Sequence, residues 1–184
     1  PCRGVEKFPE DRRWNYLSQR HVAALLAACD RDHDQHAADA VRLLLFTGAR
    51  LREVTGATWD QFDLDNGIWV KPSSHTKTKI VHRLQLAPAA VDLLRRLRRE
   101  RPDTPFLFPW QRILESADIG HHRRHDLRRT TASFMLSTGS DLMTVGKNLG
   151  HTQASTTLGY ASLFDAVQKE GITRATELMR TCSA

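Results

Sequence analysis

Several features that define other classes of protein are scarce or missing in this chain. It has only three cysteines among 184 residues, and no two of them have the close spacing that zinc sites use. We therefore expect neither a structural disulfide nor a zinc site, and interpret the thiols as reduced cytoplasmic ones. No apolar run approaches the ~18 residues of a membrane span. The first residues contain no apolar signal region, so we do not expect secretion.

Acidic residues are outnumbered by basic ones. The chain has 27 lysines and arginines against 21 aspartates and glutamates, which gives a formal net charge of +6. Arginine dominates in two runs, RRLRRER (95–101) and HHRRHDLRR (121–129). A basic surface favours a polyanionic partner, although a solvated helix face explains the first run equally well. The length suits one sizeable core and a single domain.

The spacing of apolar residues predicts a mainly helical domain. One helix is expected to start at Ser18, a good N-cap residue, and another is expected to open at Pro88. Further helices are expected over about 37–46, 50–58, 126–138, 141–149 and 165–180. Segments 67–71 and 80–86 have the composition of strands, and 102–109 is a proline-bounded connector whose phenylalanines should pack inward. The predicted fold class is α+β, mainly α-helical with a small antiparallel sheet.

Five short motifs contain cationic side chains, imidazoles and one phenol. These are Arg50 in TGARLREV (47–54), Lys77 in HTKTK (75–79), His125 and Arg128 in HDLRRT (125–130), His151 in LGH (149–151) and Tyr160 in TTLGYAS (156–162). An arginine fork fits two phosphate oxygens at once, and residues three apart on a helix share a face. The set suits attack on a phosphodiester with the protein itself as nucleophile.

Each of these residues alone also has a simpler interpretation. Arg50 fits an ordinary surface ion pair, and Glu53, one turn later, either orients Arg50 or is exposed. The histidines at 121, 122 and 125 raise the possibility of a metal cluster. However, H-H-x-x-H lacks the glutamate and the i,i+4 pair of a zinc hydrolase helix, so no metal is predicted. Lys79 stays an alternative to Lys77.

Taken in order, the motifs resemble those of the tyrosine recombinases, the phage integrase family. In that family the first arginine lies in T-G-x-R and is followed three positions later by an acidic residue. A lysine lies on a turn between two strands, H-x-x-R and leucine-glycine-histidine follow, and the nucleophile stands nine residues after that histidine, which selects Tyr160 over Tyr16. The resemblance runs from about Leu17 to the last expected helix. It implies the catalytic residues Arg50, Lys77, His125, Arg128, His151 and Tyr160.

The resemblance also implies an activity and partners. The expected activity is site-specific DNA recombination or integration through a 3′-phosphotyrosine, with no metal or nucleotide cofactor. The expected partner is double-stranded DNA, bound by a homotetramer, or by a monomer for the isolated domain, in the cytoplasm. We interpret residues 1–17 as a linker or arm from a missing N-terminal DNA-binding domain, and 18–184 as the catalytic domain. The missing initiator Met agrees with a fragment. The last helix is expected to pack either on its own domain or on a neighbouring protomer.

Other functions stay open from the sequence. A type IB topoisomerase shares the chemistry and a similar fold, but the LGH motif and the step of nine residues to Tyr160 favour a recombinase. A DNA-binding module without catalysis would show damage at one of the motif positions, and none is damaged. For a protein-interaction domain with an incidental basic face, the ordered motifs would be a coincidence.

Overall fold

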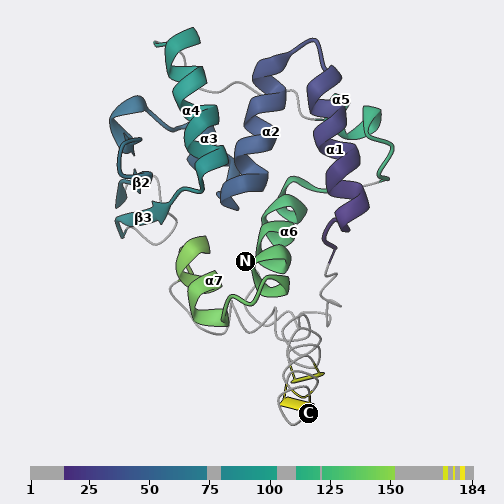
Figure 1. Ribbon diagram of the computed structural model, residues 1–184. Helices are drawn as coiled ribbons and strands as arrows, with labels where there is room; N and C mark the ends of the chain where they lie inside the picture. The colour runs from purple at the N-terminus through teal and green to yellow at the C-terminus, as the bar shows by residue number, and fades with distance from the viewer. Residues whose placement is uncertain are drawn as a thin grey trace, which may run out of the picture.

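The computed structural model describes residues 15–73, 80–102, 111–120 and 122–151, together with residues 172, 173, 176, 179 and 180. In these ranges the molecule is mainly helical, with a three-stranded antiparallel sheet at one side (Figure 1). The predicted fold class is therefore confirmed. No helix in the described ranges is both long and apolar enough to cross a membrane.

Helix α1 (Gln19–Arg31) packs against α2 (Gln35–Thr47), which lies at the centre of the described part of the molecule. Ser18 caps α1 by accepting a hydrogen bond from the His21 N–H at 3.2 Å, as predicted. Asp34 caps α2 in the same way. Helix α2 is buried along most of its length because α1, α4 and α6 all pack against it. It is therefore the element that holds the rest of the core together.

The sheet consists of β1 (Phe62–Asp63), β2 (Ile68–Lys71) and β3 (His82–Gln85), in the order β1-β2-β3. Strand β2 pairs with β3 in a register that places Trp69 opposite Leu84 and Lys71 opposite His82. The short helix α3 (Leu51–Thr55) and a 3₁₀ turn (Trp59–Gln61) connect α2 to this sheet. The sheet therefore lies directly after the segment that carries Arg50.

The proline after β3 opens α4 (Pro88–Glu100), as predicted, and its apolar face packs on α2. Two arginines of the first basic run make contacts within the fold. Arg95 donates to the Leu64 carbonyl at 3.1 Å, and Arg96 bonds to the buried Asp39 carboxylate at 2.7 Å. Two side chains of the first basic run are thus engaged within the fold.

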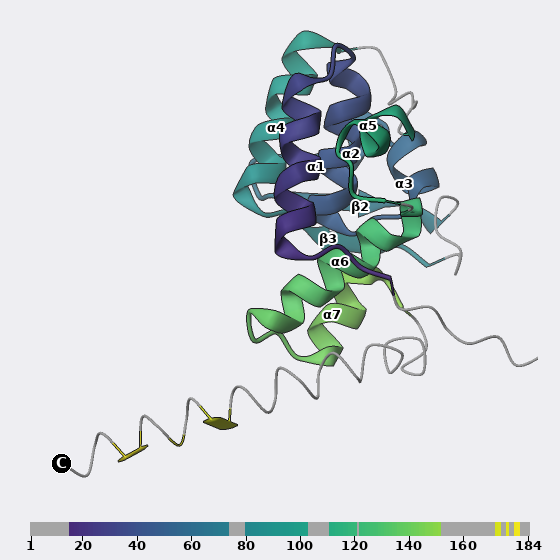
Figure 2. The ribbon, with the colours of Figure 1, turned by 90° about the vertical axis from the view of Figure 1, so that its right-hand side faces the viewer.

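The remaining helices described in full are α5 (Gln111–Ser116), α6 (Arg124–Ser137) and α7 (Leu142–Leu149). Both ribbon views place α6 and α7 together at one end of the molecule (Figures 1 and 2). They share a small apolar cluster of their own, formed by Ala132, Leu136, Val145 and Leu149. Residues 172, 173, 176, 179 and 180 are helical, in agreement with the expected last helix.

Several predicted boundaries differ from the structure. Helix α3 ends at Thr55 rather than near 58, because Gly56 caps it and a 3₁₀ turn follows. Strand β3 begins at His82, and Ile80 and Val81, expected in the strand, are exposed outside it. The structure adds β1 and α5, which the sequence did not suggest. The phenylalanines of the connector, at 106 and 108, lie outside the described residues.

Candidate active site

The first arginine motif turns the chain sharply between α2 and α3. Helix α2 ends at Gly48, which has φ +63°, a left-handed conformation that glycine adopts at little cost. A Cβ atom at this position would lie 2.8 Å from Cδ2 of Leu149, so only glycine allows the end of α7 to approach so closely. Arg50 follows as the N-cap residue of α3. The turn therefore brings Arg50 toward the leucine-glycine-histidine segment.

Glu53 holds Arg50 from one turn further along α3. Its Oε2 accepts from the Arg50 backbone N–H at 3.0 Å, and its Oε1 accepts from Nη1 of Arg50 at 2.7 Å. The Arg50 side chain is 29% exposed, whereas Glu53 is only 2% exposed. The open question about Glu53 is thus answered: it is buried and it orients Arg50, while the guanidinium remains partly accessible.

A buried lysine shares the same carboxylate. Nζ of Lys71 lies 2.9 Å from Oε2 of Glu53, and the lysine side chain is 1% exposed. Burial alone would raise the pKa of Glu53, but the Lys71 charge and the hydrogen bonds from Lys71 and Arg50 lower it to about 2. Glu53 is therefore ionised throughout the physiological range and ties the end of β2 to Arg50.

Arg128 is built into the fold more deeply than Arg50. The residue is 3% exposed. Its Nη1 donates to the Gly48 carbonyl at 2.6 Å, and its Nη2 donates to the Leu149 carbonyl. One guanidinium on α6 therefore joins the backbone of the T-G-x-R motif to that of the leucine-glycine-histidine motif.

The two histidines lie within the electric field of these arginines. Burial and the charges of Arg128 and Arg50 lower the pKa of His151 to about 4. His125 lies on an exposed part of α6, and desolvation of its ring together with Arg128 and Arg129 lowers its pKa below the usual 6.5. His151 is therefore uncharged at neutral pH, and the shift at His125 also favours the uncharged ring. A neutral imidazole has one N–H donor and one acceptor nitrogen.

The last turn of α7 is held against the sheet by a further histidine. Gly150 caps α7 with φ +65°, and a Cβ added there would lie 2.9 Å from Nδ1 of His82. Nε2 of His82 lies 2.9 Å from the Lys147 carbonyl oxygen. This close contact between β3 and α7 fixes the position at which His151 leaves the helix.

Four of the six candidate residues therefore come together from separate parts of the chain. Charge interactions link His151 with Arg50, Arg128 and His125. The other two candidates, Lys77 and Tyr160, lie outside the described residues, as do Lys79 and His121. The described part of the site is thus a cluster of two guanidiniums and two imidazoles, which suits binding of a phosphate and stabilisation of charge on its oxygens.

Sequence reasoning missed Lys71. A signal was present, because side chains alternate along a strand and Lys71 lies two positions after Trp69. Both residues are fully buried, so they share the inner face of β2. Within the described residues, no group of three or more histidine, cysteine, aspartate or glutamate side chains has an arrangement that would hold a metal ion.

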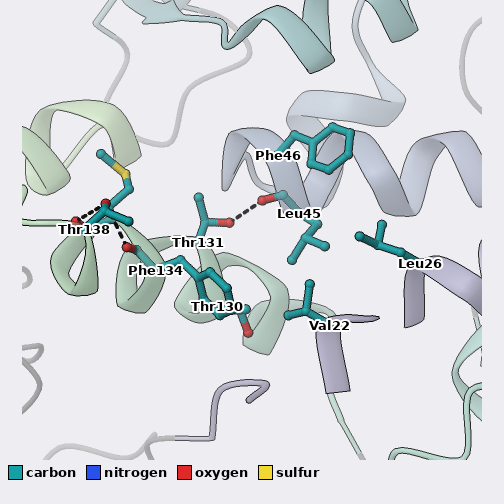
Figure 3. Close-up of a pocket in the computed structure, with 9 residues that line it drawn as sticks. Val22, Leu26, Leu45, Phe46, Thr130, Thr131, Phe134 and Thr138 are labelled. Carbon is teal, nitrogen blue, oxygen red and sulfur yellow. Dashed lines mark hydrogen bonds between the residues drawn. The ribbon is translucent and has the colours of Figure 1, made fainter. Parts of the chain in front are cut away.

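A cavity of about 340 Å³ lies apart from this cluster, between α1, α2 and α6 (Figure 3). Its lining is apolar apart from threonine hydroxyls, and Thr131 donates to the Leu45 carbonyl at 2.7 Å across it. The lining residues are Val22, Leu26, Leu45, Phe46, Thr130, Thr131, Phe134, Met135 and Thr138. None of the four candidate residues that the structure describes lines it.

Comparison with protein families and curated proteins yields a consistent result. The model of the family described as "Phage integrase family" matches residues 15–166. The integrase of Escherichia phage P2 is 28% identical over 177 residues, which cover 88% of this chain and 47% of that protein. Tyrosine recombinase XerD of Pseudomonas aeruginosa is 31% identical over 173 residues, covering 80% of this chain and 57% of that protein. The chain thus spans about half the length of these relatives.

Solved structures share the fold. XerA recombinase superposes with a TM-score of 0.70 at 23% identity, covering 92% of this chain and 66% of that one. The catalytic domain of bacteriophage HP1 integrase gives 0.68 at 23% identity, covering 86% of this chain and 94% of that domain. The Tn1549 transposon integrase in complex with a circular intermediate DNA gives 0.69 at 17% identity, covering 82% and 62%.

Proposed function

The chain belongs to the phage integrase family, and we propose on this basis that it is the catalytic domain of a tyrosine-type site-specific DNA recombinase. Its proposed substrate is double-stranded DNA, and the similar fold of the Tn1549 transposon integrase, solved in complex with a circular intermediate DNA, supports a DNA substrate. The observation that carries the proposal is the convergence of Arg50 before α3, His125 and Arg128 on α6, and His151 after α7, where the two arginine charges lower the pKa of His151. At this place a polyanion can interact with two guanidinium groups and two imidazole rings.

In the proposed reaction Tyr160 is the nucleophile. Its hydroxyl oxygen attacks the scissile phosphorus, the bond to the 5′-oxygen breaks, and a 3′-phosphotyrosine forms. The energy of the phosphodiester is kept in the new linkage, so the reverse attack by a 5′-hydroxyl rejoins the strand without a nucleotide cofactor. The free pKa of tyrosine is about 10, so a base must accept its proton during attack at neutral pH.

The described residues have separate roles in this proposal. Arg50 and Arg128 stabilise charge on the non-bridging oxygens, and His151 donates a further hydrogen bond. His125 accepts the proton of Tyr160, which its lowered pKa supports because the shift favours the uncharged ring. Lys77 protonates the departing 5′-oxygen. No step uses a metal ion.

The family match favours a recombinase over a type IB topoisomerase. We propose that residues 18–184 form the catalytic domain and that residues 1–17 connect it to an N-terminal DNA-binding domain, in a cytoplasmic enzyme. The active assembly is a homotetramer on DNA. Ile172 and Met179, which are 61% and 70% exposed and seven residues apart in helical segments, offer apolar contacts to a neighbouring protomer.

The proposed nucleophile is tested with Tyr160→Phe. The variant lacks only the attacking oxygen, so it should form no covalent complex with a nicked suicide DNA substrate while still binding DNA. Covalent product is measured on a denaturing gel, and binding by fluorescence anisotropy. Tyr16→Phe serves as the matched control and should cleave like the unmodified chain. Normal cleavage by Tyr160→Phe would reject the assignment.

A further inference from the structure

A buried lysine on the inner face of the sheet has no role in the chemistry described so far. Lys71 is the last residue of β2, and its Nζ lies 4.5 Å from the centre of the Trp69 ring on the same face. The ammonium group also donates to Oε2 of Glu53 at 2.9 Å. Lysine is almost never fully buried unless it is paired. Its position therefore depends on Glu53.

Stability alone does not explain this pair. Removing two charges from water costs free energy, and apolar residues of similar volume often replace a buried ion pair with no loss of stability. The other buried side chain on the inner face of β2 is Trp69, which belongs to the apolar core. An aliphatic side chain at position 71 would therefore suit these surroundings. We therefore look for the benefit of Lys71 in the groups whose positions it fixes.

The hydrogen bonds at Glu53 indicate that Lys71 fixes the orientation of the Glu53 carboxylate. The carboxylate receives three hydrogen bonds, and two of them, from the Arg50 backbone N–H and from Lys71, go to Oε2. Oε1 is left to accept from the guanidinium of Arg50 at 2.7 Å. With Oε2 anchored on two sides, the carboxylate plane has a fixed orientation. Without the ammonium, the carboxylate is held only by the residue that it has to orient.

We propose that Lys71 is a positioning residue for DNA cleavage, which acts through Glu53 to fix the guanidinium of Arg50 toward the scissile phosphate. The proposal rests on the recombinase function proposed above. Lys71 touches neither the phosphate nor the nucleophile in this role. It makes the placement of Arg50 depend on an ammonium group that is buried behind it.

The surroundings of Lys71 make this dependence sensitive to pH. Charged or titratable groups approach it from each neighbouring element: Glu53 on α3, Arg50 before α3, Arg128 on α6, and His82 on β3. Burial lowers the pKa of Lys71 to about 8, Glu53 opposes this effect, and the two arginines add to it. Above pH 8 the charge is lost, and Glu53 loses a charged donor.

The sign of the effect on folding is opposite to that on cleavage. The pKa of Lys71 in the folded chain, about 8, is below its ordinary value of 10.5. The unfolded chain therefore binds more protons between these values, and the contribution of Lys71 to stability rises with pH in that window. Positioning of Arg50 deteriorates over the same window. A purely structural role would not give these opposite trends.

The test compares Lys71→Met and Lys71→Arg with the unmodified chain in single-turnover cleavage of a nicked suicide DNA, at saturating protein, from pH 6.5 to 9.5. At pH 7 we expect Lys71→Met to cleave at least about tenfold more slowly, because a catalytic group displaced by 1 Å can lose on the order of 100-fold in rate. Lys71→Arg, which keeps a charged donor, should restore most of the rate. Arg98→Met, at an exposed cationic residue on α4, is the control and should cleave normally.

The dependence of the rate ratios on pH is decisive. Titration of Tyr160, His125 and Lys77 is common to all variants, so it cancels in a ratio. The deficit of Lys71→Met relative to the unmodified chain should shrink above pH 8, where the unmodified chain loses the same charge. The cleavage rate of Lys71→Arg divided by that of the unmodified chain should rise in the same range. Ratios that stay constant across pH, or a Lys71→Met variant as fast as the unmodified chain at pH 7, would overturn the proposal.

Thermal unfolding of each variant is followed in parallel. If Lys71→Met does not fold, the ratio between Lys71→Arg and the unmodified chain decides the question, and if Lys71→Arg does not fold, Lys71→Met decides it. The unmodified chain separates this proposal from the function on which it rests. Failure of that chain to capture DNA rejects the recombinase function and the Lys71 proposal together. Normal capture with indifferent Lys71 variants rejects the role of Lys71 alone.

Discussion

Arg50 and Arg128 are held by different chemical groups. A carboxylate orients Arg50, which stays 29% exposed, whereas two backbone carbonyls hold Arg128, which is 3% exposed. Replacement of Arg128 therefore disturbs the fold as well as the site. In the proposed reaction, replacement of Arg50 mainly removes a donor to the scissile phosphate. Arg50 is thus the better position at which to measure the electrostatic contribution to cleavage.

We predict that Arg50→Ala raises the barrier to DNA cleavage by about 2.7–4 kcal/mol, the usual effect of losing one donor to a developing oxyanion. Arg50→Lys should recover little of this, because an ammonium cannot make the paired bonds of the guanidinium fork. The measurement is the single-turnover cleavage rate. Arg52→Ala, at an exposed arginine on the same helix, is the control. A decrease of less than about threefold for Arg50→Ala would rule out its role in the phosphate site.

At the scale of elements, the site is assembled by two helix ends that each require glycine. Gly48 ends α2 and Gly150 ends α7, both with positive φ and both in close contact with another element. Leu149 presses on Gly48, and His82 presses on Gly150. These two contacts set the distance of α7 from α2 and from β3, and with it the positions of Arg128 and His151.

Gly150→Ala should therefore destabilise the fold by about 2–5 kcal/mol. The left-handed backbone costs about 1–2 kcal/mol for a residue with a Cβ, and crowding against His82 adds about 1–3 kcal/mol. Gly139→Ala is a close control, because Gly139 also has positive φ but no atom lies within 4 Å of its added Cβ. Urea unfolding measures both free energies. Equal losses in the two variants would show that the contact with His82 carries no cost.

The sequence predicted the helices well where a cap accompanied the apolar spacing. Ser18, Gly48, Pro88 and Gly150 all act at helix ends as expected. It did not predict β1 or α5, because two residues of strand and six of helix give too little periodicity to detect.

For the site, the ordered motifs named six residues, of which the described part of the fold brings together Arg50, His125, Arg128 and His151. The partners that orient them were harder to find. Lys71 was overlooked because a lysine at the end of a strand looks solvated in sequence. Its burial depends on Glu53, which is 18 residues away in the chain. Arg128 was predicted as a phosphate ligand, whereas its bonds to the carbonyls of Gly48 and Leu149 depend on tertiary structure alone.

At the scale of the whole molecule, the net charge of +6 favours DNA binding driven by release of counterions. We predict that the affinity for a DNA duplex falls steeply and log-linearly between 50 and 200 mM salt, with a slope of about −0.9 for each phosphate neutralised. Fluorescence anisotropy measures the affinity. Arg50→Ala should make the slope less steep by about 1, whereas Tyr160→Phe should leave it unchanged. An affinity that does not depend on salt would contradict a DNA-binding function.

The two bonds from Arg128 to backbone carbonyls have a consequence for the DNA cleavage proposed above. Its guanidinium reaches its place only when α2, α6 and α7 have all docked. A copy of the chain in which α7 is not docked would retain Arg50 but lose the alignment of Arg128. It would then lack one of the two guanidinium groups of the proposed phosphate site. If the chain cleaves DNA as proposed, an incompletely folded copy therefore lacks a complete phosphate site, and cleavage is restricted to copies in which α7 has docked.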